Sequence, residues 1–127
     1  DVKRAKLDNL YRFVTYARGL DLPFLVGTEM NAYGQRFVDD FGAPELAPLT
    51  PVFVEGAHIL YAHTLLQTHA GMGYLSPWAR TQFATVREKN AFFLQLGETV
   101  EPLRAPALKA AHAGMTPEAV LALGGQA

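Results

Sequence analysis

A short apolar run in the sequence ends in side chains that could hold a metal ion. The run 24–26 is followed closely by Thr28, Glu29 and Asn31. Its continuous apolar character predicts a short buried strand. Residues two apart share one face of a strand, and ligands sit at the carboxyl ends of parallel strands. Because carboxylate and amide oxygens suit a hard cation, Glu29 and Asn31 are the predicted metal ligands.

Other polar residues could extend this site. Thr28 could support the two ligands by hydrogen bonding, and Asp39 and Asp40 could add carboxylates from the loop 31–51. His63 is polar within an otherwise apolar stretch, which makes it a further pocket candidate. Each has a simpler interpretation, because loop acids are usually solvated and a core histidine needs a hydrogen-bond partner. Glu29 could likewise cap a neighbouring helix, and Asn31 could form a turn.

The composition bounds the partners and the compartment. Eleven basic and twelve acidic side chains give a net charge of −1, which predicts neither nucleic acid nor an anionic membrane as a partner. No apolar run reaches the roughly 20 residues of a membrane helix. The chain has no cysteine, so it has no disulfide framework and no thiolate ligand. This fits a reducing compartment, and we expect a cytoplasmic protein.

The low charge predicts apolar surface that needs a cover. Charged residues make up 18% of the chain, below the usual ~25%, and hydrophobic residues make up 50%. A small domain of this composition leaves apolar side chains exposed. We therefore expect packing against something outside these 127 residues, either a preceding segment or another copy of the chain.

The periodicity predicts a mainly α fold with one short β-strand. Apolar residues at helical spacing predict an amphipathic helix over 3–18, with Leu7, Leu10, Tyr11, Val14 and Ala17 on its core face. Gly19 then predicts a left-handed helix end. Further helices are predicted over 51–68, 77–96 and 117–123. Each is preceded by a hydroxyl residue and begins with a proline, a pattern typical of helix starts.

The segment "LDLPFLVGTEMN" resembles the last metal-ligand strand of the polymerase-and-histidinol-phosphatase (PHP) superfamily of metal-dependent phosphoesterases. That strand ends in Gly-Ser/Thr-Asp-x-His, and the matching residues here run from Gly27 to Asn31. The longer runs "VGTEMNAYGQRFVDDFGAPELAPL" and "GAHILYAHTLLQ" are also similar to such proteins. Glutamate and asparagine stand here where the family has aspartate and histidine, and asparagine binds transition metals less well than imidazole.

The resemblance implies the last αβ unit of a distorted (β/α)7 barrel over 1–48, followed by a helical C-terminal extension over 49–127. Divalent metal ions would bind in the full-length parent, whose earlier ligands would precede Asp1. The implied function is that of the C-terminal part of a phosphoesterase, inactive alone. One alternative is a helical protein-interaction or oligomerisation module without catalysis. Another is a degenerate barrel that uses its pocket for sensing.

Overall fold

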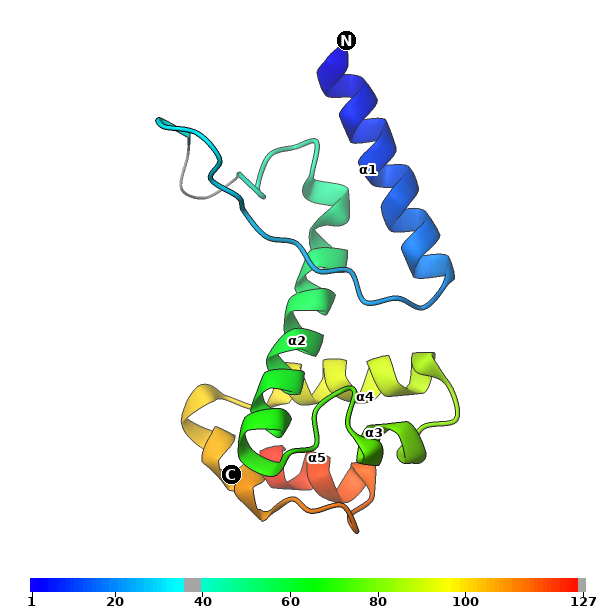
Figure 1. Ribbon diagram of the computed structural model, residues 1–127, viewed down its shortest axis with the longest axis vertical. Coiled ribbons are helices and arrows are strands. Elements are labelled where there is room, and N and C mark those ends of the chain that lie inside the picture. The colour runs from blue at the N-terminus through cyan, green and yellow to red at the C-terminus, as the bar shows by residue number, and fades with distance from the viewer. Residues whose placement is uncertain (36–39, 126–127) are drawn as a thin grey trace. The chain divides into compact units, whose positions relative to one another are not determined.

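The computed structural model describes residues 1–35 and 40–125, and the regular structure in those ranges is helical (Figure 1). The α-helices are α1 (Val2–Gly19), α2 (Thr50–Ala70), α3 (Pro77–Gln82), α4 (Val86–Thr99) and α5 (Pro117–Gly125), and the 3-10 helices are η1 (Ala47–Leu49) and η2 (Pro102–Ala110). The chain divides into two compact units, residues 1–56 and 57–127, and α2 runs across the division. Within the described ranges, no helix combines the length and apolar character needed to cross a membrane.

The predicted strand at 24–26 is wrong, and so is the αβ unit of a (β/α)7 barrel. The chain is irregular from 22 to 31, and the described ranges contain no strand at all. A strand is held by hydrogen bonds to a neighbouring strand, and the described residues offer none. Phe24 packs its ring instead, edge-on to Phe13 at 6.0 Å between centroids and stacked on Phe53 at 5.9 Å.

In the unit 1–56, α1 packs the face that its periodicity predicts. Val14 and Ala17 are buried. Val14, Leu49 and Phe53 form a small core, and partly buried side chains pack against it: Leu10, Tyr11, Phe24, Phe41 and Val52. The predicted helix end is displaced, because the helix includes Gly19 and the left-handed residue is Asp21, with φ of 54°.

Polar contacts join both ends of α1 to the rest of the same unit. Near its N-terminus, the Lys3 ammonium pairs with the Glu45 carboxylate, and the Tyr11 hydroxyl donates to the Glu45 carbonyl at 2.7 Å. At its C-terminus, the Arg18 guanidinium pairs with Glu55 at 3.1 Å. These contacts lie at the surface, where ion pairs contribute little to stability. The small core therefore supplies most of the packing in this unit.

The unit 57–127 encloses a larger core. Its largest fully buried side chains come from α2, α4, η2 and α5 and are Leu66, Phe93, Leu96, Leu108 and Val120. Tyr74, Trp78, Phe83, Phe92 and Phe93 add edge-on and tilted ring contacts at 5.1–6.0 Å. A Cβ on Gly97 would lie 2.1 Å from the His58 carbonyl oxygen, so only glycine allows this close approach of α4 to α2.

The single helix predicted over 77–96 is two helices. Between α3 and α4 the chain breaks at 83–85, where the Thr85 hydroxyl accepts the Glu88 N–H and Glu88 accepts the Thr85 N–H. This reciprocal capping box starts α4. The predicted hydroxyl caps are confirmed at Ser76 and Thr116, which accept N–H groups of the following helices. Thr50 instead donates its hydroxyl to the Leu46 carbonyl.

Candidate functional site: an exposed face of helix α1

The predicted metal ligands lie on the irregular segment of the unit 1–56. Thr28, Glu29 and Asn31 are exposed, and the Asn31 N–H donates to the Gln35 side-chain oxygen at 2.8 Å. This bond places Asn31 in a turn that extends to residue 35. The segment therefore presents the Glu29 carboxylate to solvent rather than to a cleft.

The remaining predicted site residues are dispersed. Asp39 lies outside the described residues. Asp40 is exposed, and its carboxylate accepts the Gly42 N–H at 3.1 Å. His63 belongs to α2 in the other unit, where its Nδ1 accepts the Tyr74 N–H at 2.9 Å, as the interpretation of a hydrogen-bonded histidine expects.

Divalent metal ions need several ligands that converge on one point. In the parts of the chain that the structure describes, no three His, Cys, Asp or Glu side chains converge in this way. Glu29 and Asn31 alone offer too few oxygens for a hard cation. The described residues therefore hold no metal centre of their own, and the resemblance places the family's earlier ligands before Asp1.

A second stripe of side chains runs along α1, on a face that flanks its core face. Positions 2, 6, 9, 13, 16 and 20 follow the 3-and-4 spacing of one helix face. Phe13 and Tyr16 in this stripe are 62% and 67% exposed, and Val2 and Leu20 are also largely exposed. We call residues 2, 6, 9, 13, 16 and 20 the outer stripe. Aromatic side chains this exposed mark a surface that gains free energy when it is covered.

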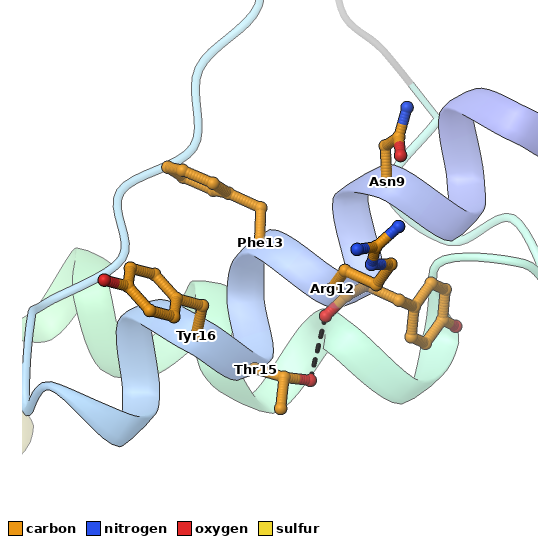
Figure 2. Close-up of a pocket in the computed structure, with 6 residues that line it drawn as sticks. Asn9, Arg12, Phe13, Thr15 and Tyr16 are labelled. Carbon is orange, nitrogen blue, oxygen red and sulfur yellow. Dashed lines mark hydrogen bonds between the residues drawn. The ribbon is translucent and has the colours of Figure 1, made fainter.

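Two open hollows follow the same helix. One, of about 820 Å³, is lined by Asn9, Tyr11, Arg12, Phe13, Thr15 and Tyr16. Figure 2 shows Phe13 and Tyr16 at one end of this group and Asn9 and Arg12 at the other. The second hollow, of about 470 Å³, is lined by Val2, Lys3, Lys6, Leu7 and Leu10. Both hollows combine apolar side chains with at least one cation, so a suitable partner has apolar groups and negative charge.

The charge of α1 is strongly positive although the chain is nearly neutral. Its 18 residues carry five basic side chains and one acidic, so 5 − 1 gives +4. Lys3 and Arg18 pair with Glu45 and Glu55. The hydrogen bond from Lys3, assisted by its charge, lowers the pKa of the Glu45 carboxyl. The other three cations of α1 have no ion-pair partner among the described residues, and they are Arg4, Lys6 and Arg12.

The apolar surface continues from α1 onto the irregular segment of the same unit. The Phe13 ring contacts Phe24, and the side chains around Phe24 are about half exposed. These neighbours are Leu22, Leu25, Val26 and Met30. Exposed apolar side chains therefore extend from the outer stripe onto segment 22–30. The prediction of exposed apolar surface is thus confirmed, and the outer stripe locates it.

Sequence reasoning identified the core face of α1 and overlooked the apolar face beside it. The signal was present, because Val2, Phe13, Tyr16 and Leu20 repeat at helical spacing just as the core residues do. A helix that carries apolar residues on two faces has more apolar surface than a single packed face covers. Comparison of the chain with protein-family models, curated proteins and solved structures found no match.

Proposed function

We propose that this chain is a self-associating interaction module and that it pairs with a second copy through the outer stripe of α1. The observation that carries this proposal is the exposure of Phe13 and Tyr16 beside uncompensated cations on the same helix. Burial of aromatic side chains is a main source of free energy in protein interfaces. The cations exclude like-charged partners and favour a surface that carries carboxylates.

A second copy satisfies both requirements. The unit that holds Lys6 and Arg12 on α1 also holds the exposed carboxylate of Glu29, which has no ion-pair partner among the described residues. In a two-fold dimer the same patch serves both copies, so a patch that carries apolar residues and both signs of charge can match itself. Stable interfaces cover about 800 Å² on each partner. We therefore expect segment 22–30 to contribute together with the outer stripe.

The test measures the molecular mass by light scattering and sedimentation over a wide range of protein concentration. We expect a concentration-dependent dimer that weakens at high salt, because surface charges are screened. Tyr16→Ser removes a ring that is 67% exposed, so folding should persist. It should raise the dissociation constant about tenfold, equivalent to ~1.4 kcal/mol.

Leu103→Ser is the matched control. Leu103 is 94% exposed and belongs to η2 in the other unit, so its loss removes a similar apolar side chain from a different surface. Its dissociation constant should equal that of the unchanged chain. A monomer at every concentration, or equal weakening by the two substitutions, contradicts the proposal.

Phosphoester hydrolysis stays a prediction that rests on the sequence resemblance. Nothing in the described geometry adds to it, because no three His, Cys, Asp or Glu side chains of the described residues converge on one point. The exposed face of α1 has a definite geometry and a direct test, and we therefore give self-association precedence.

A further inference from the structure

The outer stripe of α1 has the spacing of a coiled-coil seam. Its six positions are separated by four and three residues in strict alternation, and they are 2, 6, 9, 13, 16 and 20. This alternation is the a-and-d repeat of a coiled coil. Positions 6, 13 and 20 are then the a positions, and positions 2, 9 and 16 are the d positions. A helix with such a seam packs against a second helix at a shallow angle.

The spacing of the outer stripe is the same from either end of the helix, 4-3-4-3-4. Two copies in antiparallel orientation therefore place every stripe residue opposite another stripe residue, around a two-fold axis near position 11. The facing pairs are 2 with 20, 6 with 16, and 9 with 13. Each pair joins an a position of one copy to a d position of the other. In parallel orientation each residue would instead face its own counterpart.

Charge distinguishes these two orientations. The stripe contains one charged residue, Lys6, whose side chain is exposed and forms no ion pair among the described residues. A parallel pair would bring the two Lys6 ammonium groups to the same level of the seam, where they repel. An antiparallel pair brings each of them to the Tyr16 ring of the second copy, which is 67% exposed. Because a cation is attracted to an aromatic face, the antiparallel orientation is favoured.

The two hollows along α1 fit the same orientation. Val2 and Lys6 line the hollow near the N-terminus of the helix, and Phe13 and Tyr16 line the hollow farther along. Figure 2 shows these two rings together at one end of their hollow. Antiparallel pairing sets each hollow opposite the other hollow of the second copy. The rings of one copy can therefore enter the space beside Lys6 of the other.

We propose that α1 pairs with α1 of a second copy as an antiparallel coiled coil, with the Lys6 ammonium of each copy over the Tyr16 ring of the other. This inference rests on the self-association proposed above and adds the orientation and register of the two copies. The seam from 2 to 20 is about 27 Å long, at 1.5 Å per residue. Helices of this length are marginal alone, but the core face of α1 already packs on its own unit.

The distance between spin labels on the two copies tests the orientation. The chain has no cysteine, so one introduced cysteine gives one label per copy. Gly19→Cys suits this purpose, because a Cβ there meets no atom within 4 Å and the residue lies outside the stripe. Pulsed electron paramagnetic resonance should find the two labels about 24 Å apart along the helices. In a parallel pair they would be at one level, separated by about 8–10 Å between the helix axes.

A mixture of two labelled chains gives the opposite expectation. Ala5 is exposed and lies outside the stripe, so Ala5→Cys can carry a gadolinium label while Gly19→Cys carries a nitroxide. The unlike labels should be about 3 Å apart along the helices in the antiparallel pair and about 21 Å apart in a parallel one. A dimer in which the unlike labels are farther apart than two Gly19 labels would overturn the inference.

The role of Lys6 has a test of its own, in which the two orientations predict changes of opposite sign. Lys6→Gln should raise the dissociation constant about threefold, because the contact between cation and ring is lost. In the Tyr16→Ser background it should have no further effect. Arg4→Gln is the control, since it removes an exposed cation of α1 that lies outside the stripe, and it should leave the dissociation constant unchanged.

The outcomes separate this inference from self-association itself. Tighter association of the Lys6→Gln variant would indicate relief of repulsion between like charges and would overturn the antiparallel orientation. A dimer with Gly19 labels at one level would also overturn it, and both results would leave self-association intact. A monomer at every concentration would contradict self-association and the orientation together.

Discussion

The two units of this chain bury very different amounts of apolar side chain. In the unit 57–127, Phe93, Leu96 and Leu108 have no exposed surface, and aromatic rings pack around them. In the unit 1–56 the core consists of Val14, Leu49 and Phe53 with a few partly buried neighbours, and many of the other large apolar side chains face outward. Stability rises with the fraction of surface that folding buries. The comparison teaches that the first unit has apolar surface to offer a partner and the second has little.

The largest expected effect on the free energy of unfolding comes from removing one phenylalanine from each core. Phe93→Ala should lower the free energy of unfolding by about 3–5 kcal/mol, because the residues that enclose Phe93 on all sides would leave a cavity in its place. Phe53→Ala should lower it by less, because its ring neighbours Phe24 and Phe41 lie on irregular segments that can move into the space. Amide hydrogen exchange, resolved by residue, reports on each unit separately.

This view of the two units would be wrong if Phe53→Ala destabilised its unit more than Phe93→Ala destabilises the other. A larger loss of exchange protection for Phe53→Ala than for Phe93→Ala would mean that the small core is the more rigid one. Trp78→Phe is a useful additional variant, since the Trp78 Nε1–H donates to the Met115 carbonyl at 2.9 Å within the larger core. It keeps a ring in place and should lower the free energy of unfolding by less than Phe93→Ala.

Alanine substitutions at two glycines compare the rigidity of the two units by adding a methyl group instead of removing a ring. A Cβ at Gly97 would lie 2.1 Å from the His58 carbonyl oxygen, and one at Gly56 would lie 1.9 Å from the Phe24 carbonyl oxygen. Overpacking lowers the free energy of unfolding by about 1–3 kcal/mol. We expect Gly97→Ala at the upper end, because His58 moves only with α2, and Gly56→Ala at the lower end, because Phe24 lies on an irregular segment.

Thermal and denaturant unfolding of the two variants checks this expectation. Gly19→Ala serves as the control, since a Cβ there would meet no atom within 4 Å and the residue lies within α1. It should be neutral or stabilise by about 0.5–1 kcal/mol, as alanine replaces glycine in a helix. If Gly56→Ala and Gly97→Ala lowered the free energy of unfolding equally, segment 22–31 would be held as firmly as a helix.

Helices were predictable where local signals agree, and the break in one helix was predictable too. Ser76 and Thr116 precede prolines and cap the helices that follow, as their sequence context indicates. The interruption before α4 was overlooked although Thr85 and Glu88 have the spacing of a capping box. Strong apolar periodicity on both sides of residues 83–85 suggested a continuous helix, and the competing local hydrogen bonds prevailed.

The strand and the metal site were not predictable from local pattern. An apolar run such as 24–26 is compatible with a strand, a buried helix segment or packed irregular chain, and only a neighbouring strand decides between them. In the described ranges, the Phe24 ring found aromatic partners at 13 and 53 instead. The face that now carries the proposed function was visible as a helical repeat, but its exposure depends on tertiary packing that no local pattern reveals.

The smallest expected effect concerns the ion pair between Lys3 and Glu45, one of the surface contacts that hold α1. The hydrogen bond from Lys3 lowers the pKa of the Glu45 carboxyl in the folded chain. A carboxyl with a lowered folded-state pKa contributes stability above its unfolded pKa, and this contribution is lost as the pH falls through the folded value. Lys3→Met should therefore slightly reduce exchange protection of α1 at neutral pH and have no effect once acid has protonated Glu45. Lys109→Met, remote from this pair in the other unit, should change α1 at neither pH. A difference between Lys3→Met and the unchanged chain that persists in acid would assign the role of Lys3 to packing of its aliphatic chain rather than to its charge.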